Sequence, residues 1–182
     1  MILADREIKE AVAAGEIKID GFEEKRLQPA SYDILLGNKF VISLPEGTIA
    51  IDPVKKIFPK TREIEIEEDG EFVLHPGQMV LGMSWDFFGS DKYLIQLSGK
   101  SSLARLGLLV HNTAGIVNPG HFLNITLELY NLNSMPIILR PKMPIAQLTF
   151  SKMTSDPQAD YEKKGHYAKD NWAHFKALKK DK

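Results

Sequence analysis

The sequence predicts a single, mainly β domain, and three observations support this fold class. At 182 residues the chain is long enough for one hydrophobic core and short for two independently folding domains. Short segments rich in β-forming residues recur through most of it, and Gly/Pro turn signals separate them at short intervals. A clear helical pattern is confined to the N-terminus. This spacing favours a β-sandwich, a barrel or a jelly roll.

The first expected element is a short helix over residues 5–15. Asp5 can cap it, helix-forming residues follow, and Gly15 can end it. Twelve candidate strands come after it, at residues 17–19, 32–36, 40–44, 48–51, 62–67, 71–74, 79–85, 93–97, 108–111, 124–131, 135–139 and 145–151. A further helical turn is expected over residues 101–106, where Ser101 can serve as the cap.

The C-terminal stretch differs from the rest in composition. From about residue 154 it is polar and rich in lysine, with isolated aromatic residues, which is typical of a terminal arm. We therefore expect a β domain over residues 1–153 and an arm over residues 154–182 that is not an independent domain.

Composition excludes several classes of function. A formal net charge of −1 gives no reason to expect general nucleic-acid binding. The absence of cysteine excludes disulfides, iron–sulfur clusters and thiolate-ligated zinc, and no two histidines have the i,i+4 spacing of a helical metal pair. No apolar run approaches the roughly 18 residues of a membrane span. We expect a cytoplasmic protein with no metal held by its side chains.

The first polar segment with the character of a binding site is SGKSSLAR, residues 98–105. It places a glycine, hydroxyls and two cations within eight residues, a composition suited to holding phosphate. A Walker-type phosphate loop would need glycine at position 94, which is Leu94, so that interpretation fails. From spacing alone, an ordinary polar loop with a helix cap stays the alternative.

The second polar segment runs over residues 111–128 and leads into a strand. In that strand Thr126, Glu128 and Tyr130 share one face, and the intervening apolar residues share the other. The strand pattern alone leaves two alternatives for Glu128, a functional carboxylate or one that points into solvent.

Together these segments resemble one family, the dCTP deaminases of the dUTPase-like superfamily. The chain start at residues 1–9, LQPASYDILLG at 27–37 and FVLHPG at 72–77 are similar to family motifs. More specific motifs follow in the order and spacing of the family: GKSSLARLGL at 99–108, HNTAG at 111–115, ITLE at 125–128 and IAQL at 145–148. The resemblance covers almost the whole chain.

The resemblance implies a fold, an assembly and a location. The subunit would be a distorted β-barrel or jelly roll of the dUTPase-like type with a short N-terminal helix. Three copies would form a homotrimer, with active sites between subunits that the C-terminal arm closes. Neither nucleic acid nor a membrane is implied as a partner. Such an enzyme would serve cytoplasmic pyrimidine deoxynucleotide supply, with dCTP as substrate and dTTP as a possible inhibitor.

The resemblance also implies residue roles. Glu128 would be the general base and acid, with Ser101 and Arg105 positioning the water and the cytosine base. The substrate-binding positions it implies are Lys100, Ser102, Ala114, Asn118, Thr126, Leu127, Gln147, Tyr161, His166 and Asp170. Mg²⁺ would arrive with the triphosphate. The other large class of cytosine deaminases uses zinc held by His and Cys ligands, which a cysteine-free chain cannot assemble, so the nucleophile would have to be generated by a carboxylate.

Several positions depart from the family pattern. Asn118 stands where the family has Asp, and an amide can hydrogen-bond a 3′-hydroxyl but is a poor base. In the arm, His166 and Asp170 stand where a lysine and a glutamine are expected.

The main expectation is a zinc-free deaminase that converts dCTP to dUTP and ammonia. One alternative is a bifunctional enzyme that continues to dUMP and diphosphate, because Thr113-Ala-Gly115 is more similar to the bifunctional members. A plain dUTPase is another, although the Gly-rich C-terminal motif of dUTPases is missing and Glu128 is present. The last is a catalytically silent nucleotide-binding homologue, against which the joint presence of Ser101, Arg105 and Glu128 argues.

Overall fold

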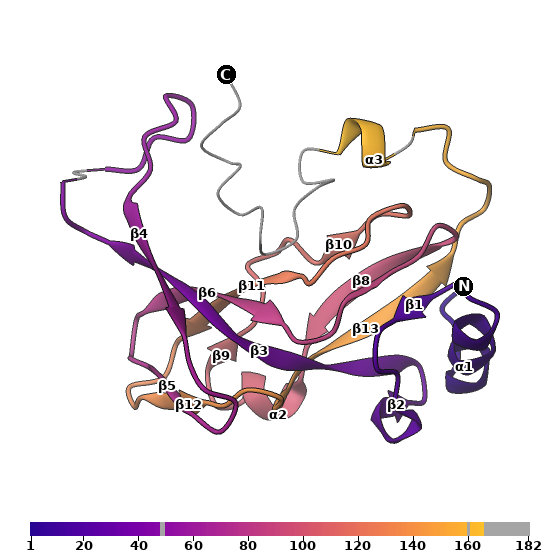
Figure 1. Ribbon diagram of the computed structural model, residues 1–182, viewed down its shortest axis with the longest axis horizontal. Helices are drawn as coiled ribbons and strands as arrows, with labels where there is room; N and C mark the ends of the chain where they lie inside the picture. The colour runs from indigo at the N-terminus through magenta and orange to yellow at the C-terminus, as the bar shows by residue number, and fades with distance from the viewer. Residues whose placement is uncertain (48–49, 160, 166–182) are drawn as a thin grey trace.

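The computed structural model describes residues 1–47, 50–159 and 161–165, and shows a curled antiparallel sheet that closes half-way into a barrel (Figure 1). Its elements are α1 (Asp5–Ala13), β1 (Lys18–Ile19), the 3₁₀ turn η1 (Glu24–Arg26), β2 (Leu27–Gln28), β3 (Ser31–Leu44), β4 (Lys60–Glu65), β5 (Phe72–Leu74), β6 (Met79–Ser84), β7 (Phe88–Gly89), β8 (Tyr93–Gly99), α2 (Ser101–Ala104), β9 (Leu108–Leu109), β10 (Ile116–Val117), β11 (Thr126–Asn131), β12 (Ile137–Leu139), β13 (Pro144–Lys152) and α3 (Tyr161–Lys164). The predicted mainly β fold, a distorted barrel or jelly roll with a short N-terminal helix, is confirmed.

One sheet contains most of the strands. Its order is β10-β8-β13-β3-β6-β11-β9, and β2 and β4 also pair with β3. Two small sheets, β1-β7 and β12-β5, complete the described strands. The long strand β3 therefore contacts four other strands, and the ribbon that it forms with β4 extends away from the body of the molecule (Figure 1).

Helix α1 confirms the prediction in position but not in its cap. Ala4 occupies the N-cap, its N–H donates to a Glu7 carboxylate oxygen at 3.1 Å, and Asp5 is the first helical residue. Asp5 accepts instead from the neighbouring Arg6 N–H. Gly15, with φ of +71°, ends the helix as expected, because a left-handed conformation strains other residues.

The strand predictions differ from the structure at three two-residue strands, at residues 50 and 51, and where two predicted strands merge into one. β3 joins two predicted strands, 32–36 and 40–44, across a register irregularity against β6. In the predicted strand 48–51, the described residues 50 and 51 are not in a strand. The two-residue strands β2, β7 and β10 were not predicted, whereas β1 and β9, of the same length, lie within the predicted strands 17–19 and 108–111.

The buried side of the sheet is apolar. Tyr32, Phe40, Leu127, Leu148 and Phe150 are all fully buried and belong to one hydrophobic cluster. In β11 the burial alternates as predicted. Leu127 and Leu129 lie in the core, while Thr126, Glu128 and Tyr130 are half-buried. None of the helices in the described ranges is long and apolar enough to cross a bilayer.

A buried ion pair ties η1 to the central sheet. Arg26 Nη1 donates to Asp86 Oδ1 at 2.7 Å, and the two side chains are 7% and 1% exposed. The second oxygen of Asp86 accepts from the Leu35 N–H of β3 at 2.8 Å, and Arg26 Nη2 donates to the Gly21 carbonyl. The guanidinium also lies 4.7 Å from the centre of the Tyr32 ring. Burial raises the pKa of the Tyr32 phenol above its usual value.

Removal of the Asp86 carboxylate should leave the buried charge of Arg26 uncompensated. We therefore expect Asp86→Ala to lower the free energy of unfolding by about 3–5 kcal/mol. Urea denaturation measures this loss. Glu71→Ala is the matched control, because Glu71 pairs with Arg140 on the surface, where such a pair contributes at most about 1 kcal/mol. Equal losses in the two variants would contradict this role of Asp86.

Candidate active site

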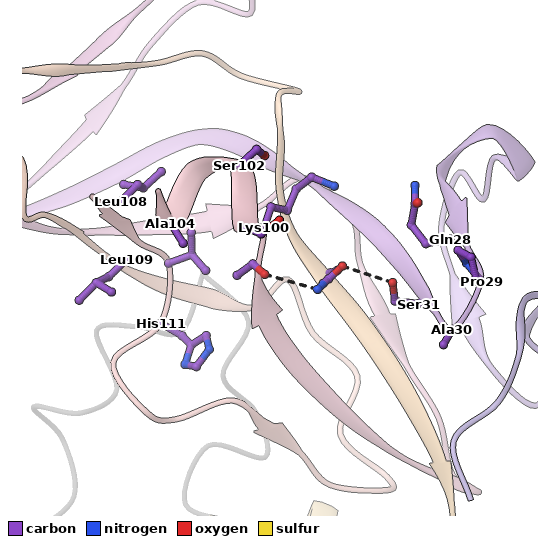
Figure 2. A pocket seen from close by; sticks show the side chains of 14 residues that line it. Gln28, Pro29, Ala30, Ser31, Lys100, Ser102, Ala104, Leu108, Leu109 and His111 are labelled. Atoms are coloured by element: carbon purple, nitrogen blue, oxygen red, sulfur yellow. Dashed lines mark hydrogen bonds between the residues drawn. The ribbon is translucent and has the colours of Figure 1, made fainter. Parts of the chain in front are cut away.

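One cavity of about 720 Å³ opens between the ends of several sheet strands. Residues 28–31 line one side, the start of α2 at residues 99–102 lines another, and residues 108–111 and Gln147 complete it together with Ala104 (Figure 2). Four of the predicted site residues are among them: Lys100, Ser101, Ser102 and Gln147. Segments far apart in the sequence meet here because β3, β8 and β13 are neighbours in the sheet.

The Gln147 amide links three strands at the floor of the cavity. In β13 it lies opposite Asp33 of β3 on one side and Ser98 of β8 on the other. The Ser31 hydroxyl donates to Gln147 Oε1 at 3.3 Å, and Gln147 Nε2 donates to the Gly99 carbonyl at 3.4 Å, as the dashed lines of Figure 2 show. The side chain is thus held in place before any ligand binds.

Lys100 supplies positive charge to the cavity. Its ammonium lies 2.5 Å from Asp33 Oδ2, and Gln28 Nε2 lies 3.4 Å from the same oxygen. Lys100 has an extended conformation and occupies the N-cap of α2, because β8 runs on to Gly99. Ser101, which we predicted as the cap, is therefore the first helical residue. An ammonium, hydroxyls and amides are the groups that bind phosphate oxygens.

Glu128 lies on β11, close to the His111 end of the cavity but not among its lining residues. One carboxylate oxygen accepts from the Asn112 N–H at 3.2 Å. β9 pairs with β11 so that Leu109 lies opposite Tyr130, and the chain then runs past His111 to Asn112. The half-buried carboxylate is therefore oriented by the backbone that follows His111.

The segment after His111 is closely packed. The Leu97 N–H donates to the Gly115 carbonyl at 2.7 Å, and a Cβ at Gly115 would lie 2.7 Å from the Leu97 carbonyl oxygen and 3.5 Å from the His111 ring. His111 Nδ1 is buried and has no hydrogen-bond partner in residues 1–47, 50–159 and 161–165. Sequence reasoning assigned no role to His111 or to Asp33, since each acquires its surroundings from strand pairing that no local pattern reveals.

The other predicted site residues do not line this cavity. Arg105, Ala114 and Asn118 are exposed, and Thr126 and Leu127 lie on β11 beside Glu128. Tyr161 packs instead on His121, with the two ring centres 4.6 Å apart. His166 and Asp170 lie outside the described residues. Within one chain, Lys100, Ser102 and Gln147 line one cavity, and Glu128 lies close to its His111 end without lining it.

Comparison with known proteins decides the family. The chain matches the dCTP deaminase-like family over residues 2–153. It belongs to that family. The resemblance inferred from the sequence motifs is thereby confirmed.

Two relatives of this dCTP deaminase-like chain carry the same name. A protein of Corynebacterium jeikeium named "dCTP deaminase, dUMP-forming" is 43% identical over 162 residues, which cover 88% of this chain and 86% of the relative. A protein of Dictyoglomus thermophilum with that name is 42% identical over 168 residues, or 90% and 87% of the two chains.

A solved structure shares the fold. The 2′-deoxycytidine 5′-triphosphate deaminase from Agrobacterium tumefaciens superposes with a TM-score of 0.63 at 22% identity, over 84% of this chain. The match spans about half of that protein, 48% of its length. At this identity the likeness shows the fold alone.

Because Gly115 is closely packed, we expect a larger side chain there to destabilise the fold. Gly115→Ala should lower the free energy of unfolding by about 1–3 kcal/mol, because the new methyl group meets a backbone oxygen that cannot move without breaking the bond to Leu97. Thermal unfolding measures the loss. Gly99→Ala is the control, since its Cβ meets only a Val110 methyl at 3.3 Å, which can give way. A greater loss at Gly99 would contradict this reasoning.

Proposed function

We propose that this chain is a bifunctional enzyme that deaminates dCTP and hydrolyses the product to dUMP and diphosphate. The observation that carries the proposal is a carboxylate, Glu128, held by a backbone N–H next to a cavity with the chemistry of a phosphate site. Relatives named "dCTP deaminase, dUMP-forming" favour this bifunctional hypothesis over our main expectation of a deaminase that stops at dUTP. The Thr113-Ala-Gly115 segment agrees with it.

In the deamination step, Glu128 acts as general base and then as general acid. It takes a proton from the water that attacks carbon 4 of the cytosine ring and delivers it to ring nitrogen 3. It then takes the proton of the new C4 hydroxyl and delivers it to the amino group, which leaves as ammonia while the carbonyl forms. Ser101 and Arg105 position the water and the base. The backbone of Thr126 and Leu127 reads the edge of the cytosine ring, since it adjoins Glu128 on the same strand.

The triphosphate occupies the cavity, where Lys100, Ser102 and Gln147 bind it. Mg²⁺ would arrive with the nucleotide and keep most of its water shell. Further contacts come from Ala114 and from the arm through Tyr161, His166 and Asp170.

The complete site forms between copies of the chain in a homotrimer. Supporting this, Arg105 and Glu128 do not line the cavity that contains Lys100 in the same chain. Large apolar side chains near β9 are exposed, among them Leu106, Leu109 and Leu132, and such surface is suited to burial against another subunit. Cytoplasmic location and inhibition by dTTP belong to the same proposal.

Product analysis tests the reaction directly. With dCTP and Mg²⁺ we expect ammonia, dUMP and diphosphate in equal amounts, measured by chromatography and an ammonia assay. dUTP as the end product would mean that the enzyme stops after deamination. Formation of dUMP from added dUTP but not from dCTP would indicate a plain dUTPase, and the absence of any product would indicate a silent nucleotide-binding homologue.

Glu128→Gln should lower the rate of ammonia release by roughly 10²–10⁴-fold, because the amide cannot shuttle protons, while dCTP still binds. Steady-state kinetics and calorimetric titration measure the two effects. Glu65→Gln, at an exposed glutamate of β4, serves as the control and should retain full activity. Unchanged turnover in Glu128→Gln would remove Glu128 from the mechanism.

Asn118→Asp tests the second step. A carboxylate at this position can act as a base where the amide cannot, so hydrolysis of added dUTP should become roughly tenfold faster or more, with ammonia release little changed. The ratio of the two rates is the measurement. An unchanged ratio would show that position 118 does not limit phosphate hydrolysis.

A further inference from the structure

A buried negative charge lies beside the cavity in which we propose the triphosphate to bind. Asp33 of β3 is 7% exposed, and its side chain reaches Lys100. A carboxylate near a site for a polyanion is unfavourable by simple charge repulsion. Its presence therefore needs a physical explanation.

The surroundings of Asp33 make it dependent on Lys100. Its Oδ2 accepts from the Lys100 ammonium at 2.5 Å and from the Gln28 amide at 3.4 Å. Its Oδ1 is buried and has no hydrogen-bond partner among the described residues. Buried carboxylates are costly unless paired, so the Lys100 charge is what makes this one tolerable.

The backbone that carries Asp33 cannot shift easily. Arg26 Nη1 lies 3.4 Å from the Asp33 carbonyl oxygen, and Asp86 Oδ2 holds the Leu35 N–H two residues further on. On the other side, Asp33 is in register with Gln147 of β13. The carboxylate is thus a fixed point beside the cavity.

We propose that Asp33 is a positioning residue that holds the Lys100 ammonium where it binds phosphate. An ammonium has three donors, so one serves Asp33 and two are left for phosphate oxygens. Lys100 does not leave Asp33 when the nucleotide binds, because departure would strand a buried charge. Fixing a flexible lysine before binding reduces the entropy lost when the nucleotide binds. This role rests on the proposed triphosphate site.

A double-mutant cycle tests whether Asp33 acts through Lys100. Asp33→Asn, Lys100→Met and the double variant are titrated calorimetrically with inorganic tripolyphosphate, and their kcat and KM are measured with dCTP and Mg²⁺. We expect Asp33→Asn to weaken tripolyphosphate binding and raise KM about tenfold, with kcat within about twofold. In the Lys100→Met background it should cause no further weakening. Asp91→Asn, at an exposed acidic residue, should change neither quantity.

Three results would overturn the proposal. Tighter tripolyphosphate binding by Asp33→Asn would indicate that the carboxylate repels phosphate, and unchanged binding would indicate that it has no role. Equal weakening with Lys100 present and in the Lys100→Met background would indicate a role that does not involve Lys100. If the unmutated protein binds neither tripolyphosphate nor dCTP, the proposed function fails as well. If it binds and turns over dCTP while Asp33→Asn behaves normally, this inference alone fails. Should Asp33→Asn not fold, Asp33→Ser, which leaves room for a water, replaces it with the same expected result.

Discussion

The buried pair of Arg26 and Asp86 fixes the part of β3 on which the rest of the structure depends. β3 pairs with β2, β4, β6 and β13, and the ion pair ties its residues 33–35 to the turn η1 and to the segment after β6. Asp33 on this fixed strand forms an ion pair with Lys100 at the start of α2. A surface ion pair contributes little by comparison, because solvent screens it. The rigid centre of the sheet thus determines where the positive charge of the cavity lies.

The sequence predicted what local patterns encode. Alternation along residues 124–131 correctly placed Glu128 on the face away from the core, and helix formers ending at Gly15 located α1. Ordered motifs identified the family. Contacts between residues far apart in the sequence were not predictable. Asp33 and Lys100 are 67 positions apart, and Tyr161 packs on His121, which is also distant in the sequence. The cap of α1 was also misassigned, because Glu7 satisfies the N–H of Ala4 and moves the start of the helix to Asp5.

The site is organised as two neighbouring parts with different chemistry. The cavity gathers an ammonium, hydroxyls and amides that suit phosphate, while Glu128 is oriented separately by the backbone after His111. Under the proposed function, phosphates bound in the cavity would make binding energy available to the chemistry at the ring.

The central claim is that dCTP is converted to dUMP by one enzyme, and a quenched time course with dCTP labelled at the α-phosphate tests it most directly. With dCTP in large excess over the enzyme, we expect the label to pass into dUMP while free dUTP never exceeds the concentration of active sites. Accumulation of dUTP in solution to the level of the dCTP consumed, with no dUMP, would contradict it.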